Sequence, residues 1–415
     1  MTLIKTSILS AISTAIKIIA GFVSIKIVAV YIGPSGLALM GQFQNFISMM
    51  SGIAGAGVNS GVIKYTAEHY ADEEIKRKIW SSALQISLVL IIPMAIAIIF
   101  LADFISLKLF NTIQYSSIFI VFAISIVFFV LNGLLTSILN GQKEIKKLTI
   151  LNIVGSLLGL LITVYLVINY ELYGALIAGV ISQSIVFFVT LVFVLKSSWF
   201  KLSMFLGSID NEYRNKLLKF SLMFLTYATM TPLSHMYVRD YIGTNIGWDE
   251  AGYWQAIWRI SETYLMLITT TLSIYYLPKL SSIQDKSELK SELLYGYKII
   301  IPIVITMALG IYIFRDFIIQ ILFTEAFSPM AELFLYQLIG DVIKIAAWLL
   351  GYIMVAKAMV KMAVISEVFF VWSFVGFVVL FVDMYGLIGV TIAFMVNYFI
   401  YMIFLYFSLK GHLNG

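Results

Sequence analysis

The chain has no cysteine among its 415 residues, and charged residues make up only 12% of it. The absence of cysteine excludes disulfides, thiol chemistry and iron–sulfur clusters. The three histidines, His69, His235 and His412, are scattered along the sequence, which argues against a metal centre built from histidine. The sequence also lacks a G-x-x-x-x-G-K-[ST] pattern, so ATP is not its energy source. We therefore expect no catalytic residues, no cofactor and no metal site.

The shortage of charge accompanies a surplus of apolar residues. Hydrophobic residues make up 61% of the chain, and its mean hydropathy is +0.98. Soluble proteins carry about 25% charged residues, so the composition predicts an integral membrane protein. The N-terminal segment MTLIKTSILS leads directly into a long apolar stretch without a cleavage site, and we interpret it as part of a retained first helix.

Twelve apolar stretches are long enough to cross a bilayer as helices, which takes about 20 residues each. Only helices and closed barrels satisfy their backbone polar groups in lipid, and these stretches are too long and continuous for barrel strands. The predicted fold class is therefore an all-α integral membrane protein with twelve transmembrane helices. The predicted spans are 7–32, 37–62, 80–102, 115–140, 148–169, 173–195, 219–242, 250–277, 297–322, 331–355, 363–383 and 387–409.

The positions of lysine and arginine orient these spans, because cytoplasmic loops carry an excess of both residues. If both termini are cytoplasmic, the inner segments hold 20 basic residues and the outer segments hold two, Lys108 and Arg315. The basic residues behind the net charge of +5 are sorted by membrane side, so this charge does not indicate a nucleic-acid partner. A charge at the centre of a membrane costs about 2.5–3.5 kcal/mol on insertion scales. Function is therefore expected at the five basic residues inside spans: Lys17, Lys26, Arg239, Arg259 and Lys344.

The two halves of the sequence resemble each other at an offset of 212 to 215 residues. LYGALIAG at 172–179 matches MYGLIGVT at 384–391, and Lys64 matches Lys279. An even number of helices in each repeat makes the two halves parallel. We predict an N-terminal lobe, a cytoplasmic interfacial linker rich in Trp, Phe and basic residues, and a C-terminal lobe, with the bounds 1–195, 196–218 and 219–415.

Polar residues of the first two spans are candidates for substrate binding. Lys17 lies on one helical face of polar and small residues, together with Ser10, Ser13, Thr14, Gly21 and Ser24. Lys26 is half a turn out of phase, so it lines the same cavity only if the helix bends, and otherwise it pairs within its lobe or snorkels to the outer interface. The amides of Gln42 and Asn45 could hydrogen-bond a sugar. The glycines of GIAGAGVNSG (52–61) are interpreted as helix-packing residues.

The C-terminal spans carry three pairs of polar residues at helical spacing. Arg239 either anchors the outer interface with Asp240 or lines a cavity, and His235, one turn before it, is interpreted as a packing residue rather than a proton relay. Arg259 and Glu262 either pair with each other or face the cavity. Asp341 and Lys344 in YQLIGDVIKIAAWLLGY either neutralise each other or form an ion-coupling site, because a buried carboxylate is the usual coupling device in transporters.

Several strings resemble those of a known transporter family. WDEAGYWQAIWRISETYL (248–265), SIYYLPKLS (273–281), GAGVNSGVIKYTAE (55–68) and LIGDVIKIAAWLLGYIMVAKA (338–358) are similar to segments of lipid III and O-antigen flippases. These flippases form the Wzx-type branch of the multidrug/oligosaccharidyl-lipid/polysaccharide exporter superfamily. The resemblance runs the whole length of the chain. The sequence departs from the family pattern at Arg259, which is not matched by a base, and at Asp240, which replaces a base.

The resemblance implies an architecture, a location and a cargo. It implies two six-helix lobes around a central cleft in the bacterial inner membrane. The implied cargo is an undecaprenyl-pyrophosphate-linked oligosaccharide, carried to the periplasmic leaflet by alternating access and coupled to H⁺ or Na⁺. We favour an O-antigen repeat unit over lipid III, with a drug antiporter as a more distant alternative. Membrane lipids, an O-antigen polymerase and a chain-length regulator are further expected partners.

The roles expected of individual residues follow from the interpretation as a transporter. An enzyme such as a polymerase would need a large periplasmic loop, and none is present, so we expect a transporter that is not an enzyme. Pyrophosphate recognition requires fixed positive charge. The residues expected to bind substrate are Lys17, Lys26, Gln42, Asn45, Arg239 and Arg259, and those expected to couple ions are Asp341, Glu262 and Lys344.

Overall fold

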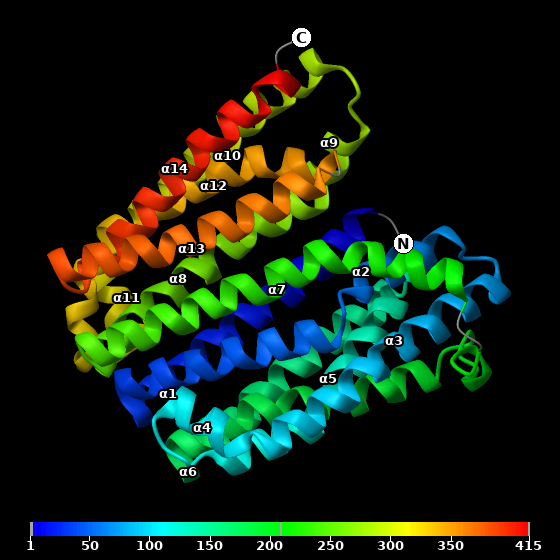
Figure 1. Ribbon diagram of the computed structural model, residues 1–415, viewed down its shortest axis with the longest axis horizontal. Coiled ribbons are helices and arrows are strands. Elements are labelled where there is room, and N and C mark those ends of the chain that lie inside the picture. The colour runs from blue at the N-terminus through cyan, green and yellow to red at the C-terminus, as the bar shows by residue number, and fades with distance from the viewer. Residues whose placement is uncertain (1–2, 208–209, 358, 414–415) are drawn as a thin grey trace. The chain divides into compact units, whose positions relative to one another are not determined.

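The computed structural model describes residues 3–207, 210–357 and 359–413 (Figure 1). Every regular element within these ranges is a helix, which confirms the prediction of an all-helical fold. Eight described stretches are long and apolar enough to cross a membrane. The long helices α7 (Asn211–Asn245) and α8 (Trp248–Thr271) are more polar and fall outside that set.

The chain divides into two compact units, the first formed by residues 1–32 and 39–233 and the second by residues 33–38 and 234–415. Helices α1 and α7 therefore contribute residues to both units. The remaining elements of the first unit are α2 (Val58–Glu68), α3 (Glu73–Phe100), α4 (Ala102–Phe110), α5 (Ser116–Gly141), α6 (Ile145–Leu195) and the short helix η1 (Leu202–Met204).

Two of the long apolar stretches contain a break. Helix α1 (Leu3–Ala54) is interrupted at Gly33, whose φ of 67° and ψ of −169° suit a residue without a Cβ, and the next residue is Pro34. Helix α6 is interrupted at Glu171, which has a φ of 49°. Both breaks fall in the short gaps predicted between neighbouring spans, so each stretch consists of two helices joined end to end.

The second predicted span is not continuous. The helix ends at Ala54, and Ala56 and Gly57 have φ values of 49° and 64° before α2 begins. The prediction of an unbroken helix over 37–62 is therefore wrong at this turn. The glycines do serve close packing as predicted, because a Cβ on Gly52 would lie 2.7 Å from Ala228 and one on Gly57 would lie 2.8 Å from Phe224.

Aromatic side chains fill the interior of the first unit. Phe43 and Phe46 of α1 meet Phe119 of α5 edge to face, with ring centroids 5.5 and 5.4 Å apart. Phe110 of α4 and Phe122 of α5 join the same cluster. Aromatic pairs of this geometry add about 0.5–1.5 kcal/mol beyond the area that they bury. They position the second half of α1, which carries Gln42 and Asn45.

The predicted interfacial linker packs onto the first unit. Trp199 and Phe205 meet the buried Trp80 of α3, with ring centroids 5.4 and 5.8 Å apart. These rings therefore pack against the protein core, and the position of this segment in the membrane interface stays a prediction. Leu202 and Leu206 of the same segment are exposed.

The second unit contains helix α8 and the elements that follow it. These are the π-helix η2 (Leu272–Tyr276), α9 (Leu277–Ser282), α10 (Lys286–Ile313), α11 (Arg315–Leu322), η3 (Glu325–Leu333), α12 (Phe334–Ala356), α13 (Val360–Tyr385) and α14 (Ile388–Leu413). Helix α14 packs against both α12 and α13 (Figure 1). Residues 33–38 join this unit because the Ser35 N–H donates to Asp249 over 3.1 Å and Gly252 lies directly against the Pro34 carbonyl.

Candidate functional site

The candidate site is a cluster of charged and aromatic side chains on α7, α8, α12 and α14 in the second unit. Its centre is Trp258 of α8. The Trp258 indole N–H donates to Glu262 over 2.9 Å, and the other oxygen of that carboxylate lies 3.4 Å from Arg259. Spacings of three and four residues place all three side chains on one side of the helix. The predicted pairing of Arg259 with Glu262 is therefore present, and both side chains are nearly half exposed.

Asp341 of α12 is completely buried, at 0% exposure. One carboxylate oxygen accepts a hydrogen bond from the Tyr264 hydroxyl over 2.9 Å, and the other accepts one from the Gln337 amide over 3.2 Å. Buried polar groups are normally satisfied in this way. The carboxylate is thus tied to α8 and to its own helix.

Lys344, one turn further along α12, lies among aromatic rings. Its ammonium is 5.0 Å from the Trp348 ring centroid, 5.2 Å from that of Trp258, and 5.7 Å from those of Phe394 and Tyr398. Electron-rich ring faces attract a cation in such positions. We call Trp258, Trp348, Phe394 and Tyr398 the aromatic cage.

The contacts of Asp341 and Lys344 bear on the two interpretations of the acid and base on α12. Asp341 bonds to Tyr264 and Gln337, whereas Lys344 faces the rings, and the described contacts include no ion pair between them. The two side chains therefore form no direct ion pair, but their charges still interact across one helical turn, so the choice between mutual neutralisation and ion coupling stays open. Both side chains contact neighbouring helices: Asp341 contacts α8, and Lys344 contacts α8 and α14.

Arg239 of α7 is buried, with 2% of its surface exposed. Its guanidinium donates to the Gln255 side-chain oxygen and lies 5.4 Å from the Trp254 ring centroid. The interpretation of Arg239 as an interface anchor is wrong, because an anchor would be exposed. His235, one turn earlier, packs edge to face on Trp258 at 4.3 Å, as expected of a packing residue, and the absence of a proton-relay role stays a prediction.

The remaining sequence-predicted residues lie in the first unit. Lys17 is exposed, Lys26 is half-buried, and Gln42 is buried with 2% of its surface exposed. Asn45 is half-buried, and its side-chain nitrogen is enclosed without a hydrogen-bond partner. The Ser10 side chain, predicted on the same face as Lys17, lies outside the described residues. The substrate-binding role of these residues stays a prediction.

Sequence reasoning missed the side chains that hold the charges. Tyr264, Gln337, Gln255 and the rings around Lys344 read as ordinary helix residues in the sequence. A signal exists for some of them, because Gln337 precedes Asp341 by four residues and Trp348 follows Lys344 by four. Residues four apart meet on one face of a helix. Contacts between α8, α12 and α14 carry no such periodic signal.

The candidate site contains cationic and aromatic side chains. Within the described residues, no group of three or more His, Asp or Glu side chains could hold a metal ion. Arg259 presents an accessible guanidinium, whereas the Trp258 ring is buried and, with the half-buried Trp348 ring, lies against Lys344. An accessible guanidinium of this kind can bind an anionic group.

Comparison with known proteins identifies the family of this chain. Residues 27–332 match the model of a family described as polysaccharide biosynthesis protein. The chain belongs to this family. It is 31% identical over 403 residues to the lipid III flippases of Escherichia coli (strain K12) and Shigella flexneri, over 97% of this chain and 96% of each relative. The predicted resemblance to flippases is thus confirmed at the level of the family.

Solved structures confirm the fold. An inward-facing multidrug resistance MATE family transporter of the MOP superfamily matches with a TM-score of 0.81 and 17% identity, over 96% of this chain and 94% of that one. A MOP superfamily transporter from Pyrococcus furiosus matches with a TM-score of 0.67 and 16% identity, over 97% of this chain and 95% of that one. The family member described here is a multi-pass membrane transporter with a MATE-like fold and is not an enzyme.

Proposed function

We propose that the protein flips a lipid-linked oligosaccharide, an undecaprenyl-pyrophosphate-linked O-antigen repeat unit, from the cytoplasmic to the periplasmic leaflet of the bacterial inner membrane. Membership of the polysaccharide biosynthesis family and the similarity to lipid III flippases support a cargo of this class. The alternative cargo is lipid III itself. A drug antiporter is a more distant alternative, supported only by the fold.

The observation that carries the proposal is the set of cations kept inside the second unit. Arg239 and Lys344 are held by Gln255 and Trp254 and by the aromatic cage, and Arg259 is held by Glu262. A pyrophosphate needs positive charge that is already in place, and arginine supplies two parallel donors to it. Arg259 is accessible, so we assign it the first contact with the pyrophosphate.

The sugars of the cargo require flat apolar surfaces and amides. The half-buried Trp348 supplies a ring in the second unit, and Gln42 and Asn45 supply amides in the first. The enclosed Asn45 nitrogen has a donor to spare. Lys17 and Lys26 add positive charge on α1 and complete the predicted set of binding residues.

Transport would proceed by alternating access through twelve spans. Each half of the two interrupted stretches counts as one span, and α7 and α8 complete the number. The predicted lobes are 1–195 and 219–415 around a central cleft, with 196–218 as the linker and both termini cytoplasmic. MATE family transporters of the same fold have been captured in inward-facing and outward-facing conformations. The occurrence of both conformations in this fold supports alternating access.

Asp341 and Glu262 are the proposed coupling residues, with Lys344 between them in the aromatic cage. An intramembrane carboxylate that takes up H⁺ or Na⁺ can reset a carrier after it has released its cargo. Asp341 is fully buried, so an ion reaches it only when α8 and α12 part at the Tyr264 hydrogen bond. An O-antigen polymerase and a chain-length regulator are the proposed protein partners downstream.

Complementation tests the function. The chain is expressed in one strain that lacks its O-antigen flippase and in a second strain that lacks its lipid III flippase. Restored O-chain in the first strain supports the proposed cargo. Restoration only in the second strain assigns lipid III instead, and drug efflux without either restoration overturns the proposal.

The cationic site has its own test in the same strain. The combined change Lys17→Ala, Arg239→Ala and Arg259→Ala should abolish O-chain assembly while the protein is still present in the membrane. Because Arg239→Ala could prevent folding, Lys17→Ala with Arg259→Gln is measured beside it. Intact O-chain from both variants would show that these cations do not bind the pyrophosphate.

A further inference from the structure

The turn after α5 has a lysine at a position that favours glycine. The Lys143 N–H donates to the Asn140 carbonyl over 2.9 Å, and the Glu144 N–H donates to the Leu139 carbonyl over 3.0 Å. These two hydrogen bonds define a Schellman motif, in which the residue at the Lys143 position has a left-handed backbone and is usually glycine. Lys143 has a φ of 59°. A residue with a Cβ is strained in this conformation, so this lysine destabilises the turn that it occupies.

The Lys143 side chain shares one aromatic ring with a second lysine. Its ammonium lies 5.5 Å from the centroid of the Tyr70 ring, and the Lys76 ammonium lies 5.7 Å from the same centroid. Tyr70 follows the end of α2, and Lys76 lies near the start of α3. We call Tyr70, Lys76 and Lys143 the Tyr70 cluster. It joins the ends of three helices that pack against one another, α2, α3 and α5.

Lys76 brings a buried positive charge to the Tyr70 cluster, because only 6% of its surface is exposed. Its ammonium donates to the Tyr70 carbonyl over 2.8 Å. Glu73 interacts with it electrostatically, but the Glu73 carboxylate forms its ion pair with Lys201, over 2.8 Å. Buried charges are normally paired directly, so the charge of Lys76 is only partly compensated by the described residues.

The acids around Lys143 have other partners or lie in solvent. The Glu144 carboxylate lies 3.1 Å from the Lys147 ammonium. Asp72 accepts a hydrogen bond from the first turn of α3, and Glu68 at the end of α2 is exposed. The described contacts of the exposed Lys143 ammonium include the Tyr70 ring and no carboxylate. Two like charges therefore lie over one ring without an acid between them.

We propose that the Tyr70 cluster binds a phosphate group. The phosphate accepts hydrogen bonds from the ammonium groups of Lys143 and Lys76, beside the half-exposed Tyr70 ring. Charge-assisted hydrogen bonds of this kind are strong, and basic segments at the cytoplasmic surface attract anionic lipids. The predicted orientation places both lysines on the cytoplasmic side. Two sources carry such a group, an anionic phospholipid headgroup and a soluble phosphate, and none of the three residues belongs to the proposed cargo site.

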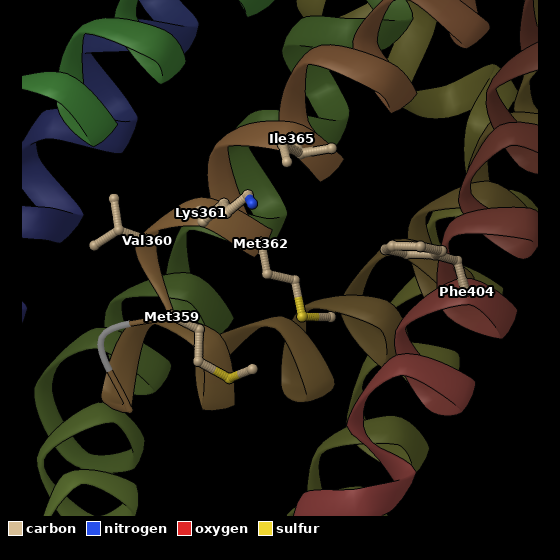
Figure 2. Close-up of a pocket in the computed structure, with 6 residues that line it drawn as sticks. All are labelled: Met359, Val360, Lys361, Met362, Ile365 and Phe404. Carbon is tan, nitrogen blue, oxygen red and sulfur yellow. The ribbon is translucent and has the colours of Figure 1, made fainter.

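The corresponding turn of the second unit is built differently. It lies between α12 and α13, which match α5 and the first half of α6 in the sequence repeat. A cavity of about 680 Å³ opens there between the start of α13 and Phe404 of α14 (Figure 2). Met359, Met362 and Ile365 line it, and Lys361 is its one basic residue. The lysine pair of the Tyr70 cluster is therefore not a feature that the repeated fold requires.

Native mass spectrometry of the full chain, purified in detergent, tests the proposal with added phosphatidylglycerol. We expect the parent protein to retain a phosphatidylglycerol adduct. Lys143→Gly should weaken this adduct about fivefold, which is the usual contribution of one lysine near the membrane surface. The same variant should raise the unfolding temperature, because glycine adopts the left-handed backbone without strain. A lysine that served only the fold would not give these two opposite effects.

Three further variants separate the cluster from charge in general. Lys143→Arg keeps the positive charge and should retain the adduct. Lys146→Gln removes the charge of an exposed lysine outside the cluster and should also retain it. Lys76→Gln should weaken the adduct, and Lys143→Gly decides the question if this buried change lowers expression. Equal loss in Lys146→Gln, an undiminished adduct in Lys143→Gly, or a lower unfolding temperature of Lys143→Gly would overturn the proposal.

Inorganic phosphate and phosphatidylcholine identify the source of the phosphate group. If inorganic phosphate displaces phosphatidylglycerol from the parent protein, the Tyr70 cluster accepts a soluble phosphate. If the adduct persists, the cluster is assigned to the lipid headgroup. Equal retention of phosphatidylcholine would show that the acyl chains alone hold the lipid, and the proposal would be overturned, as it would if the parent protein retained neither phosphatidylglycerol nor inorganic phosphate.

Discussion

Asp341 and Lys344 are one helical turn apart on α12, yet the carboxylate bonds to Tyr264 and the ammonium lies over the rings of Trp258 and Trp348. Two opposite charges this close on one helix would ordinarily pair. Here α8 and α14 supply further partners, so the two charges interact electrostatically without a direct ion pair between them. Burial of the carboxylate and its hydrogen bond to another helix make Asp341 a candidate for ion coupling.

Replacing Asp341 with Asn should abolish ion-driven turnover while sparing the fold. The amide has nearly the shape of the carboxylate and still accepts the hydrogen bond from Tyr264, so the free energy of unfolding should change by about 1.5 kcal/mol at most. The measurement is flipping in proteoliposomes with and without an imposed H⁺ or Na⁺ gradient. Unchanged turnover would make Asp341 a structural residue.

Replacing Trp258 with Phe should separate two contacts of one side chain. The variant keeps an aromatic ring for Lys344 but loses the N–H donor to Glu262. We expect the free energy of unfolding to fall by about 1 kcal/mol, the usual contribution of one hydrogen bond. Denaturation in detergent measures it, and Trp254→Phe is the control, because the buried Trp254 indole N–H has no hydrogen-bond partner among the described residues. Equal losses in the two variants would argue against the Glu262 bond.

Arg239 should not tolerate lysine. A lysine lacks the planar group that lies over Trp254 and donates to Gln255, so Arg239→Lys should lose about 2 kcal/mol of stability. The control is Arg315→Lys, where a half-buried arginine lies 4.6 Å from the Tyr312 ring and the loss should be about 0.5 kcal/mol. Thermal unfolding compares the two, and a larger loss at Arg315 would contradict the prediction.

The turn before α2 should depend on glycine at position 57. Gly57→Ala places a Cβ 2.8 Å from Phe224 and requires a left-handed backbone, so we expect a loss of at least about 1–2 kcal/mol. Gly21→Ala is the matched control, because no atom lies within 4 Å of its Cβ and its backbone is helical. That control should be neutral or stabilise by up to about 1 kcal/mol. Destabilisation by both changes to the same extent would refute the account.

The sequence predicted the helices well because bilayer-crossing segments are recognised by length and hydropathy alone. The gaps around Gly33 and Glu171 were placed correctly for the same reason. The turn at Ala56 was missed, since small residues are equally compatible with a packed helix and with a tight turn.

By itself the sequence determined the helical membrane fold, the polar residues inside it and the resemblance to flippases, all of which depend on composition, spacing and local strings. Only the tertiary structure decided which charged side chain contacts which partner. Asp341 could have paired with Lys344, and Arg239 could have anchored an interface. Tyr264, Gln255 and the aromatic cage compete for the same charges from other helices, and contacts between residues far apart in the chain leave no periodic trace in it.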